Sequence, residues 1–292
     1  MQENFFVKSH GLGNDYIVLD EAKLNFSLNE KAIRDICDIH YGIGSDGILL
    51  HVPSSKADFG LKIFNPDASE AEKSGNGLRI FCKFLYDYGY VAKKEFTIET
   101  KGGLVKATIE KVSSQGKAQI ITVDMGKAIF TPKEIPVKLG NTECLGEILS
   151  IGGKEAGNKE YEVNCVSVGN PHCVILKDTL DESEIKEFGP FIENHSAFPN
   201  RINVQFAKVL SRSEVQILIW ERGAGYTLAS GSSSCAVASI MKKRGLCDGD
   251  MTIHMPGGTL RIQIDDQWNI RMTGAVQEIA NGVLSAELLE TF

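Results

Sequence analysis

The segments AEKSGNGLRIFCKFLYDYG (71–89) and LASGSSSCAVASIMKKRG (228–245) decide the fold, because they are two copies of one pattern. Each copy opens with a serine in a loop of small residues, Ser74 in the first and Ser230 in the second. An apolar segment of helical period follows and ends at a glycine fifteen positions after the serine. The two copies therefore predict two equivalent loop and helix pairs.

The similarity of the two copies continues after these segments. A pair of glycines opens a strand-like run in each copy, in TKGGLVKATIE at 100–110 and in MPGGTLRIQID at 255–265. A second strand-like run closes each copy, VDMGKAIF at 123–130 and IRMTGAVQEI at 270–279. Self-similarity over such a long period, in only two copies, indicates a duplicated domain rather than a solenoid.

Length and periodicity set the expected architecture. A chain of 292 residues exceeds what one core usually supports, so we expect two domains. The first should cover residues 1–120, completed by the C-terminal segment 275–292, and the second should cover 121–274. Short alternating runs outnumber helical segments, which predicts an α/β fold dominated by strands. Helical period marks the segments 29–37, 77–88, 182–194 and 233–244.

The composition narrows the class of partner. The net charge is −7, the isoelectric point is near 5.5 and no segment gathers Lys and Arg, which argues against nucleic acid or an anionic membrane surface. A small soluble ligand is therefore expected. The chain start does not resemble a signal peptide and no apolar run reaches about 18 residues, so we expect a cytoplasmic protein. Seven cysteines without a CxxC pair predict neither disulfides nor a zinc site, and most should be buried.

Both serine loops lead into the N-terminus of an apolar helical segment. Unpaired backbone N–H groups and the helix macrodipole favour an anion there. The acidic stretch NPDASEAEKSGNGLR (65–79) also fits a simple helix cap, but the GNG after Ser74 favours exposed N–H groups. GIGSDG (42–47) lacks the strand and acidic residue of a dinucleotide site and is interpreted as a glycine-rich turn.

Three further polar clusters have two interpretations each. HGLGND (10–15) fits turn and capping chemistry as well as a site. The Glu-Arg pair of WERGAGYTLASGSSSCA (220–236) fits a surface ion pair beside a serine-rich cap as well as a binding role. VGNPHCVI (168–175) places His172 at a proline turn, where a lone histidine is more often structural, although its titration range suits a base.

Taken in order, HGLGND, NPDASEAEKSGNGLR, VGNPHCV, INVQF and ERGAGYTLASGSSSCA resemble the diaminopimelate epimerase family over essentially the whole chain. The resemblance implies two similar α/β domains, each a mostly antiparallel, barrel-like sheet around a central helix, with the ligand clamped between them. It implies catalysis without pyridoxal phosphate, any other cofactor or a metal. In that family one cysteine from each domain acts at the α-carbon, one as the thiolate that takes the proton and one as the thiol that returns it.

The resemblance also implies the site residues. Both cysteine positions are occupied by serine, Ser74 and Ser230, and His172 and Glu221 are further candidates for proton transfer. The implied substrate-binding residues are Asn14, Asn65, Gly75, Asn76, Asn170, Asn203, Glu221, Arg222, Gly231 and Ser232. In this set the loop N–H groups would hold the α-carboxylate, while Arg222 and the amides of Asn65, Asn170 and Asn203 would bind the far carboxylate and Glu221 the far amine.

The two serines are the main departure from the family. A serine hydroxyl is a weak base unless an adjacent group activates it, so thiol-type epimerisation should be severely impaired. Three explanations stay open: deliberate replacement of both cysteines, a natural lineage with other proton chemistry, and a binding protein that does not catalyse. The bases available to such a lineage are His172, Glu221, Asp67, Glu70 and Glu72. Lys73 before the first serine and Tyr226 in ERGAGYT are unusual for the family, which favours natural divergence.

We therefore expect a cofactor-independent isomerase that interconverts LL- and meso-diaminopimelate by two-base proton transfer at the α-carbon, in lysine and peptidoglycan precursor synthesis. The alternatives are a related isomerase of the same fold, similar to the phenazine-pathway isomerases or another amino-acid racemase, and a non-catalytic amino-acid binder. The expected partner is a small-molecule amino acid, with neither nucleic acid nor membrane, and a homodimer is left open.

Overall fold

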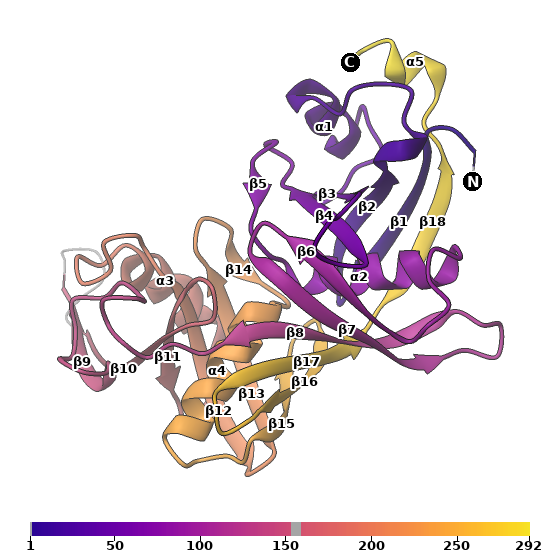
Figure 1. Cartoon of the computed structure of the whole chain (residues 1–292). Coiled ribbons are helices and arrows are strands. Elements are labelled where there is room, and N and C mark those ends of the chain that lie inside the picture. Colours follow the sequence, from indigo (N-terminus) through magenta and orange to yellow (C-terminus); the bar gives the residue numbers. More distant parts are fainter. Residues whose placement is uncertain (1, 153–158) are drawn as a thin grey trace. The chain divides into compact units, whose positions relative to one another are not determined.

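The computed structural model describes residues 2–152 and 159–292, which form two compact units. Unit 1 extends to Asp124 and resumes at Thr273, and unit 2 covers Met125–Met272. The chain leaves unit 1 within β8 (Ala118–Lys127) and returns to it within β17 (Asn269–Ala275), as Figure 1 shows. Within the described ranges no helix is both long and apolar enough to cross a membrane.

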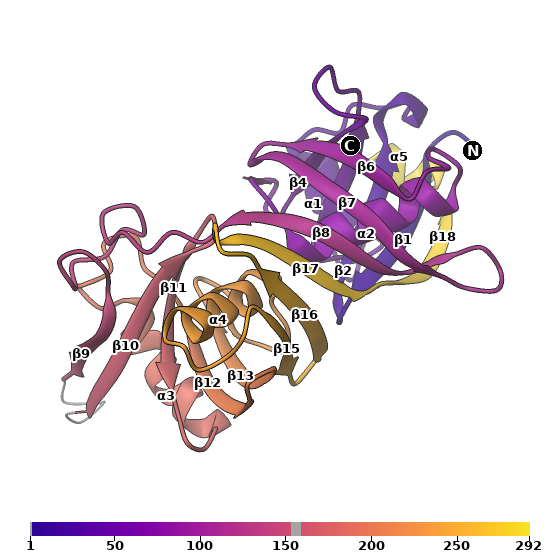
Figure 2. The ribbon, with the colours of Figure 1, turned by 60° about the horizontal axis from the view of Figure 1, so that its bottom comes forward.

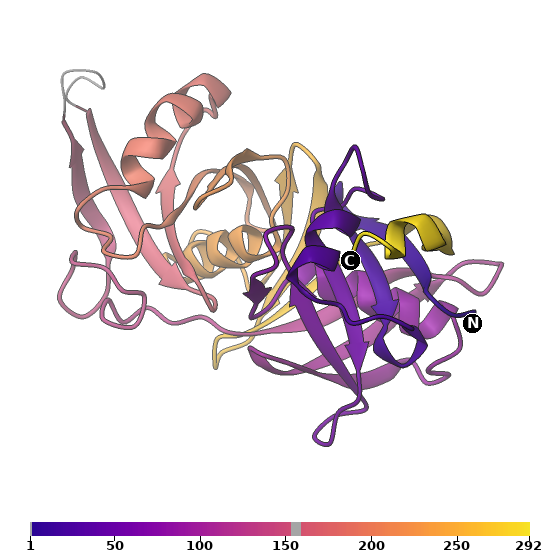
Figure 3. The same ribbon diagram turned by 90° about the horizontal axis from the view of Figure 1, so that it is seen from above.

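Unit 1 is a curved sheet around one helix. Its elements are β1 (Phe5–Gly11), β2 (Asn14–Asp20), the 3-10 helix η1 (Glu21–Lys23), α1 (Glu30–Cys37), β3 (Ile48–Val52), β4 (Phe59–Phe64), β5 (Glu70–Ala71), α2 (Gly75–Asp87), β6 (Glu95–Thr100), β7 (Gly103–Val112), β8, β18 (Gln277–Val283) and α5 (Ala286–Leu289). The C-terminal segment belongs to this unit because β18 pairs with β1 and α5 lies beside α1 (Figure 3). A hydrogen bond from Thr291 Oγ1, two residues after the end of α5, to Asp35 Oδ2 of α1 is 3.0 Å long and ties the C-terminal segment to α1.

Unit 2 has the same construction. Its elements are β9 (Leu145–Ile151), β10 (Lys159–Ser167), β11 (Pro171–Leu176), α3 (Glu182–Glu193), β12 (Asn203–Ser211), β13 (Glu214–Glu221), β14 (Gly225–Thr227), α4 (Gly231–Lys243), β15 (Asp250–Met255), β16 (Gly258–Ile264) and the start of β17. Figure 2 shows strands β10 to β13, β15 and β16 surrounding α4. Strand β9 pairs with β10, and residues 153–158, between these two strands, lie outside the described residues.

Strand pairing confirms the predicted duplication. In unit 1, β1 to β2 is antiparallel, β2 to β3 parallel, β3 to β4 antiparallel, β4 to β6 parallel and β6 to β7 antiparallel. In unit 2, β10, β11, β12, β13, β15 and β16 repeat this alternation in the same order. A short strand precedes the central helix in both units, β5 before α2 and β14 before α4. The predicted fold class, two similar α/β domains with a barrel-like sheet around a central helix, is therefore confirmed.

The central helices α2 and α4 consist mainly of small and apolar residues, which allows the sheet of each unit to surround them. Every residue from Gly75 to Leu85 of α2 is buried, and α4 is buried along most of its length. A glycine with positive φ follows the C-cap residue of each helix, Gly89 at 77° after α2 and Gly245 at 70° after α4. That left-handed conformation ends a helix at little cost only when the residue lacks a Cβ. The glycine fifteen positions after each serine is thus the stop signal of a central helix.

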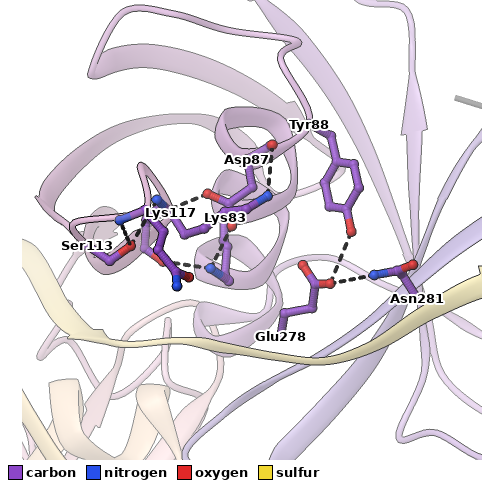
Figure 4. A network of polar contacts seen from close by, with 9 residues as sticks. Lys83, Asp87, Tyr88, Ser113, Lys117, Glu278 and Asn281 are labelled. Carbon is purple, nitrogen blue, oxygen red and sulfur yellow. Dashed lines mark hydrogen bonds and ion pairs between the residues drawn. The ribbon is translucent and has the colours of Figure 1, made fainter.

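A buried polar network holds the far end of α2 (Figure 4). Lys83 Nζ and Asp87 Oδ2 lie 2.6 Å apart, and their side chains are 8% and 0% exposed. The same two groups bind both sides of the Ala118 peptide, Lys83 at its carbonyl and Asp87 at its N–H. The Tyr88 hydroxyl donates to Glu278 of β18 at 3.1 Å. These bonds connect the C-terminal end of the helix to β8 and β18.

Candidate active site

Ser74 is the N-cap of α2. Its backbone is extended, with φ −136° and ψ 119°, and its Oγ accepts a hydrogen bond from the Gly77 amide at 3.1 Å. The Tyr16 hydroxyl lies 3.2 Å from the same Oγ. A Cβ on Gly77 would come within 3.2 Å of the Ser74 Oγ, so glycine is needed to leave this cap undisturbed. The first turn, with Gly75 and Asn76, has the form of a helix N-terminus able to receive an anion.

The structure brings Asn14 and Asn76 together. Asn76 Nδ2 donates to Asn14 Oδ1 at 3.2 Å, across 62 residues of sequence. Asn14 begins β2 after a tight turn in which Leu12 and Gly13 have φ of 57° and 90°. HGLGND is therefore both a turn and the support of a predicted binding residue.

The acidic stretch before Ser74 forms a turn of its own. Asn65 Nδ2 donates to Ser69 Oγ at 2.9 Å, and Asp67 accepts the Ser69 hydroxyl and amide at 2.6 and 2.9 Å. These hydrogen bonds hold the pKa of Asp67 below its ordinary value, which makes it a weaker base. Glu70 lies 3.7 Å from Lys101 in a partly exposed ion pair. Neither carboxylate has the buried environment that raises basicity.

Ser230 occupies the equivalent N-cap of α4. Its backbone is extended, with φ −149° and ψ 126°, and its Oγ accepts from the Ser233 amide at 3.3 Å. Ser232 Oγ lies 3.5 Å from Ser230 Oγ, in the first turn that Gly231 opens. Beside this cap, burial raises the pKa of the Glu221 carboxyl, and a hydrogen bond with the Ser230 side chain offsets only part of the rise. The hydroxyl of Ser230 is thus paired with a carboxylate that is more basic than usual.

His172 is fully buried in a neutral relay. Gln205 Nε2 lies 3.1 Å from His172 Nδ1 and donates to Ser233 Oγ at 3.0 Å. On the other side His172 Nε2 lies 2.9 Å from Asn170 Oδ1. An amide nitrogen can only donate, so Nδ1 accepts and the ring proton resides on Nε2, which donates to Asn170. Burial lowers the pKa of His172 to about 3, so at neutral pH the ring is uncharged and orients Asn170 instead of offering a free base.

Asn203 and Arg222 lie together at the start of β12 and the end of β13. Asn203 Oδ1 accepts from the Arg222 amide at 3.0 Å, and its Nδ2 donates to the Pro171 carbonyl at 2.9 Å. Arg222 NH1 donates to the Asn200 carbonyl at 3.0 Å. Parallel pairing of β11 with β12 sets His172 directly beside Asn203. Unit 2 therefore gathers its predicted binding residues at one end of three strands.

A buried carboxylate that sequence reasoning missed organises the same region. Glu193, 5% exposed, accepts from Trp220 Nε1 at 2.8 Å, from the Gly223 amide at 3.0 Å and from Arg201 NH1 at 3.0 Å. Because Trp220 and Gly223 flank Glu221 and Arg222 in sequence, Glu193 holds both ends of that dipeptide.

The sequence does contain a signal for Glu193. The buried face of α3 consists of Ile185, Phe188, Gly189, Ile192 and Glu193. This spacing is the i, i+3, i+4, i+7, i+8 template of a core-facing helix, so the glutamate occupies a core position and must have partners inside the protein. Tyr16 and Gln205 carry no such signal, because they sit in apolar strands whose neighbours only the sheet determines.

Each unit thus assembles its own half of the predicted residue set. Unit 1 contains Ser74, Gly75, Asn76, Asn14 and Asn65, and unit 2 contains Ser230, Gly231, Ser232, Asn170, His172, Asn203, Glu221 and Arg222. All seven cysteines are free and buried, as predicted for most of them, so none is available as an exposed thiol.

Comparison with known proteins agrees with this architecture. The profile of the family described as diaminopimelate epimerase matches residues 6–131 and 164–279. The chain is 49% identical over 284 residues to diaminopimelate epimerase 2 of Nostoc sp., covering 97% of this chain and 96% of that protein. It is 38% identical over 279 residues to the diaminopimelate epimerase of Pelotomaculum thermopropionicum, covering 95% and 97%.

Solved structures share the fold at low sequence identity. A probable proline racemase from Agrobacterium radiobacter superposes with a TM-score of 0.71 at 14% identity, over 97% of this chain and 93% of that one. A methylitaconate-delta-isomerase superposes with a TM-score of 0.67 at 14% identity, over 98% and 96%. The fold, the duplicated pairing order and the sequence matches agree, and the chain belongs to the diaminopimelate epimerase family, as an isomerase of the epimerase class.

Proposed function

We propose that this protein interconverts LL- and meso-diaminopimelate by moving the proton of the α-carbon, without pyridoxal phosphate, in the synthesis of lysine and peptidoglycan precursors. The observation that supports the proposal is that Ser74 and Ser230 occupy equivalent N-cap positions at the two central helices, α2 and α4. Both hydroxyls stand at the positions of the family's acid and base, and beside Ser230 burial raises the pKa of the Glu221 carboxyl. A perturbed carboxyl of this kind suits general-base work.

In the proposed reaction the α-proton passes to Ser230 Oγ while the Ser230 hydroxyl proton passes to Glu221. The serine stays neutral, the carboxylate becomes a carboxylic acid, and the electron pair remains on the α-carbon and its carboxylate. Ser74 then delivers its hydroxyl proton to the opposite face of the carbon and is reprotonated by Tyr16 or by solvent. Glu221 returns its proton to solvent to complete the cycle. N–H groups at the two helix N-termini would stabilise the charge on the carboxylate.

This oxygen-based path should be slower than one based on thiols. Hydroxyl groups are much weaker acids than thiols, and a serine functions as a base only through its activating partner. Restoring cysteine at both positions should therefore accelerate the reaction. The other retained groups support the same substrate class, because Arg222 and the neighbouring amides suit a second carboxylate.

The test is α-proton exchange and epimerisation of LL-diaminopimelate in heavy water, followed by NMR and chiral chromatography. Three proteins are compared: the parent chain, Ser74→Cys/Ser230→Cys and Glu221→Gln. We expect slow exchange in the parent, at least tenfold faster exchange in the double variant and a large loss in Glu221→Gln. Because the native cysteines are all buried, thiol chemistry in the double variant can be assigned to the new residues. Absence of both binding and exchange in all three proteins would exclude diaminopimelate as the substrate.

One observation favours a second candidate, a related isomerase acting on another substrate. Beside Ser230 the described residues include the Glu221 carboxyl, of raised pKa, whereas the group beside Ser74 is the phenol of Tyr16, so the two positions differ in basicity. A single base that removes a proton from one carbon and returns it to another on the same face would move a double bond. Double-bond migration in an unsaturated amino acid, without epimerisation of diaminopimelate, would select this candidate. Tight binding of diaminopimelate with no exchange would instead indicate a non-catalytic binder.

A further inference from the structure

Two charged residues stand at the ends of a hydrogen-bonded chain that passes through both asparagines of the Ser74 loop region. Asp46 Oδ2 accepts from Asn14 Nδ2 at 2.8 Å. Asn14 Oδ1 accepts from Asn76 Nδ2 at 3.2 Å, and Asn76 Oδ1 accepts from Arg79 NH2 at 2.8 Å. The chain begins at an exposed carboxylate and ends at a guanidinium that is fully buried.

The charged ends fix the direction of both amides. An aspartate carboxylate can only accept and a guanidinium can only donate. Asn14 must therefore turn its NH2 group toward Asp46 and its oxygen toward Asn76, and Asn76 must turn its oxygen toward Arg79. Reversing either amide would place two donors or two acceptors against each other. In each amide the oxygen faces a donor of the chain and accepts one hydrogen bond from it, while the NH2 group uses one of its two hydrogens within the chain.

Neighbouring backbone groups hold both ends of this series of hydrogen bonds in place. The Asp15 amide donates to the same Asp46 Oδ2 at 3.1 Å, and the Asp46 amide donates to the Asp15 carbonyl at 3.2 Å. At the buried end, a Cβ on Gly11 would come within 3.1 Å of Arg79 NH2, so this glycine of HGLGND leaves room for the guanidinium. Arg79 NH1 also donates to the Gly75 carbonyl at 3.1 Å, which ties it to the first turn of α2.

We propose that Asp46 and Arg79 are specificity-determining positioning residues, which orient Asn14 and Asn76 so that the Ser74 loop favours a carboxylate over its neutral amide. GIGSDG thus contributes to binding through Asp46, although it does not itself touch the ligand. The proposal rests on the proposed function for the identity of the ligand, and the orientation of the amides stands independently of it.

The experiment compares the parent with Asp46→Asn, which keeps the shape of the side chain but replaces the acceptor-only carboxylate by an amide that can also donate, so that only Arg79 still fixes the direction of Asn14 and Asn76. The first readout is the ¹⁵N–¹H spectrum of the side-chain amides in the free protein, which requires no ligand. The second is the ratio of the dissociation constants of LL-diaminopimelate and its α-monoamide, measured by calorimetry. Asp58→Asn is the matched control, since Asp58 is also partly exposed and accepts several hydrogen bonds in unit 1, from Lys93 and Thr97.

We expect Asp46→Asn to shift the Asn14 and Asn76 side-chain resonances and to reduce the preference for the carboxylate about five- to tenfold, the scale of one hydrogen bond. Asp58→Asn should change neither. Arg79→Lys, which retains one donor charge but not the fork, should shift the Asn76 resonance in particular. Unchanged amide resonances in both Asp46→Asn and Arg79→Lys, or an unchanged ligand ratio in a protein that binds diaminopimelate, would overturn the inference. Failure of all the proteins to bind either ligand would count against the proposed function, while the amide spectra would still decide the inference.

Discussion

Ser74 and Ser230 occupy the same structural position in the two units, but different groups lie beside their hydroxyls. Both are N-caps with extended backbones, and both accept a hydrogen bond from the amide three residues later. The neighbour of Ser74 is the phenol of Tyr16, whereas the neighbour of Ser230 is the carboxyl of Glu221. The two units therefore share the N-cap conformation of the serine but differ in the acid–base group that lies beside its hydroxyl.

The polar supports of the two loops differ in the same way. The asparagines near Ser74 are oriented between a carboxylate and a guanidinium, Asp46 and Arg79. Near Ser230 the relay through Gln205 and His172 is neutral. A charged pair fixes amide direction at any pH at which both groups stay ionised. A neutral relay fixes it only as long as the tautomer of the histidine is held.

The opposite ends of the two central helices also differ. α2 ends at the buried pair Lys83 and Asp87, while α4 ends at partly exposed basic residues such as Arg244, which binds Glu162 at 2.8 Å. A buried pair is costly to break because one charge is left without its partner, whereas an exposed pair contributes little. The two helices should therefore respond very differently to loss of a charge.

The largest predicted effect is on the rate of α-proton exchange and concerns the different groups beside the two serines. Glu221→Gln removes the activating carboxylate and should lower α-proton exchange by about 10²- to 10⁴-fold, the usual contribution of general acid–base catalysis. Tyr16→Phe removes one neutral hydrogen bond and should cost about tenfold or less. Exchange rates in heavy water measure both. Equal losses in the two variants would show that the serine positions are chemically equivalent.

Stability gives an independent check on Glu221. Its pKa in the folded protein is raised above the ordinary value of 4.5, so the folded state binds the proton more tightly than the unfolded state. Stability should therefore decrease as pH rises from about 4.5 through the folded pKa. Glu221→Gln should lack this loss and be the more stable protein at neutral pH, as measured by urea unfolding at several pH values.

The second effect concerns the far ends of the helices. Lys83→Met leaves Asp87 buried without its cation and should lower the free energy of unfolding by about 3–5 kcal/mol. Arg244→Met, at the end of α4, should lower it by about 1 kcal/mol or less. The double variant Lys83→Met/Asp87→Leu should recover part of the loss. Urea unfolding measures both free energies. Similar losses of stability in Lys83→Met and Arg244→Met would contradict the expected difference between the two helix ends.

The third prediction concerns Glu193, which binds the residues on either side of Glu221 and Arg222 in unit 2. Glu193→Gln places an amide against the Trp220 and Gly223 donors and should cost about 2 kcal/mol of stability. It should lower kcat as well as raise KM about tenfold, since it displaces both the base Glu221 and the binding residue Arg222 from the substrate. Trp220 fluorescence should shift. The control is Glu184→Gln on the same helix, whose carboxylate binds Lys159 and Lys177; it should leave KM unchanged.

The smallest effect tests the neutral relay. In Gln205→Glu a carboxylate faces His172 Nδ1, so the ring proton should move to Nδ1 and the pKa of His172 should rise from about 3. Asn170 would then turn its NH2 toward the ring, with a change in activity of only a few-fold. Ring ¹⁵N chemical shifts report the tautomer directly. A ring that keeps its proton on Nε2 in this variant would contradict the assigned direction of the relay.

Much of the fold follows from local sequence. The serine caps, the glycine stops after the central helices and the alternating strands each depend on residues within four positions of one another, so a linear pattern contains the information. The same holds for the duplication, which strand pairing confirms. The candidate residues of the two loops also come from contiguous motifs, which is why Asn14 and Asn76 could be chosen before their contact was known.

The tertiary structure alone decided what those residues can do. The sequence by itself determined a duplicated α/β chain with a capped, anion-receptive helix in each half. It did not determine that His172 is buried and neutral, that a carboxyl lies beside Ser230 and a phenol beside Ser74, or that Asp46 orients Asn14. Proton affinity and amide direction depend on burial and on the charges that surround a group. Those charges come from strands and turns distant in sequence, and only the folded sheet brings them within hydrogen-bond distance.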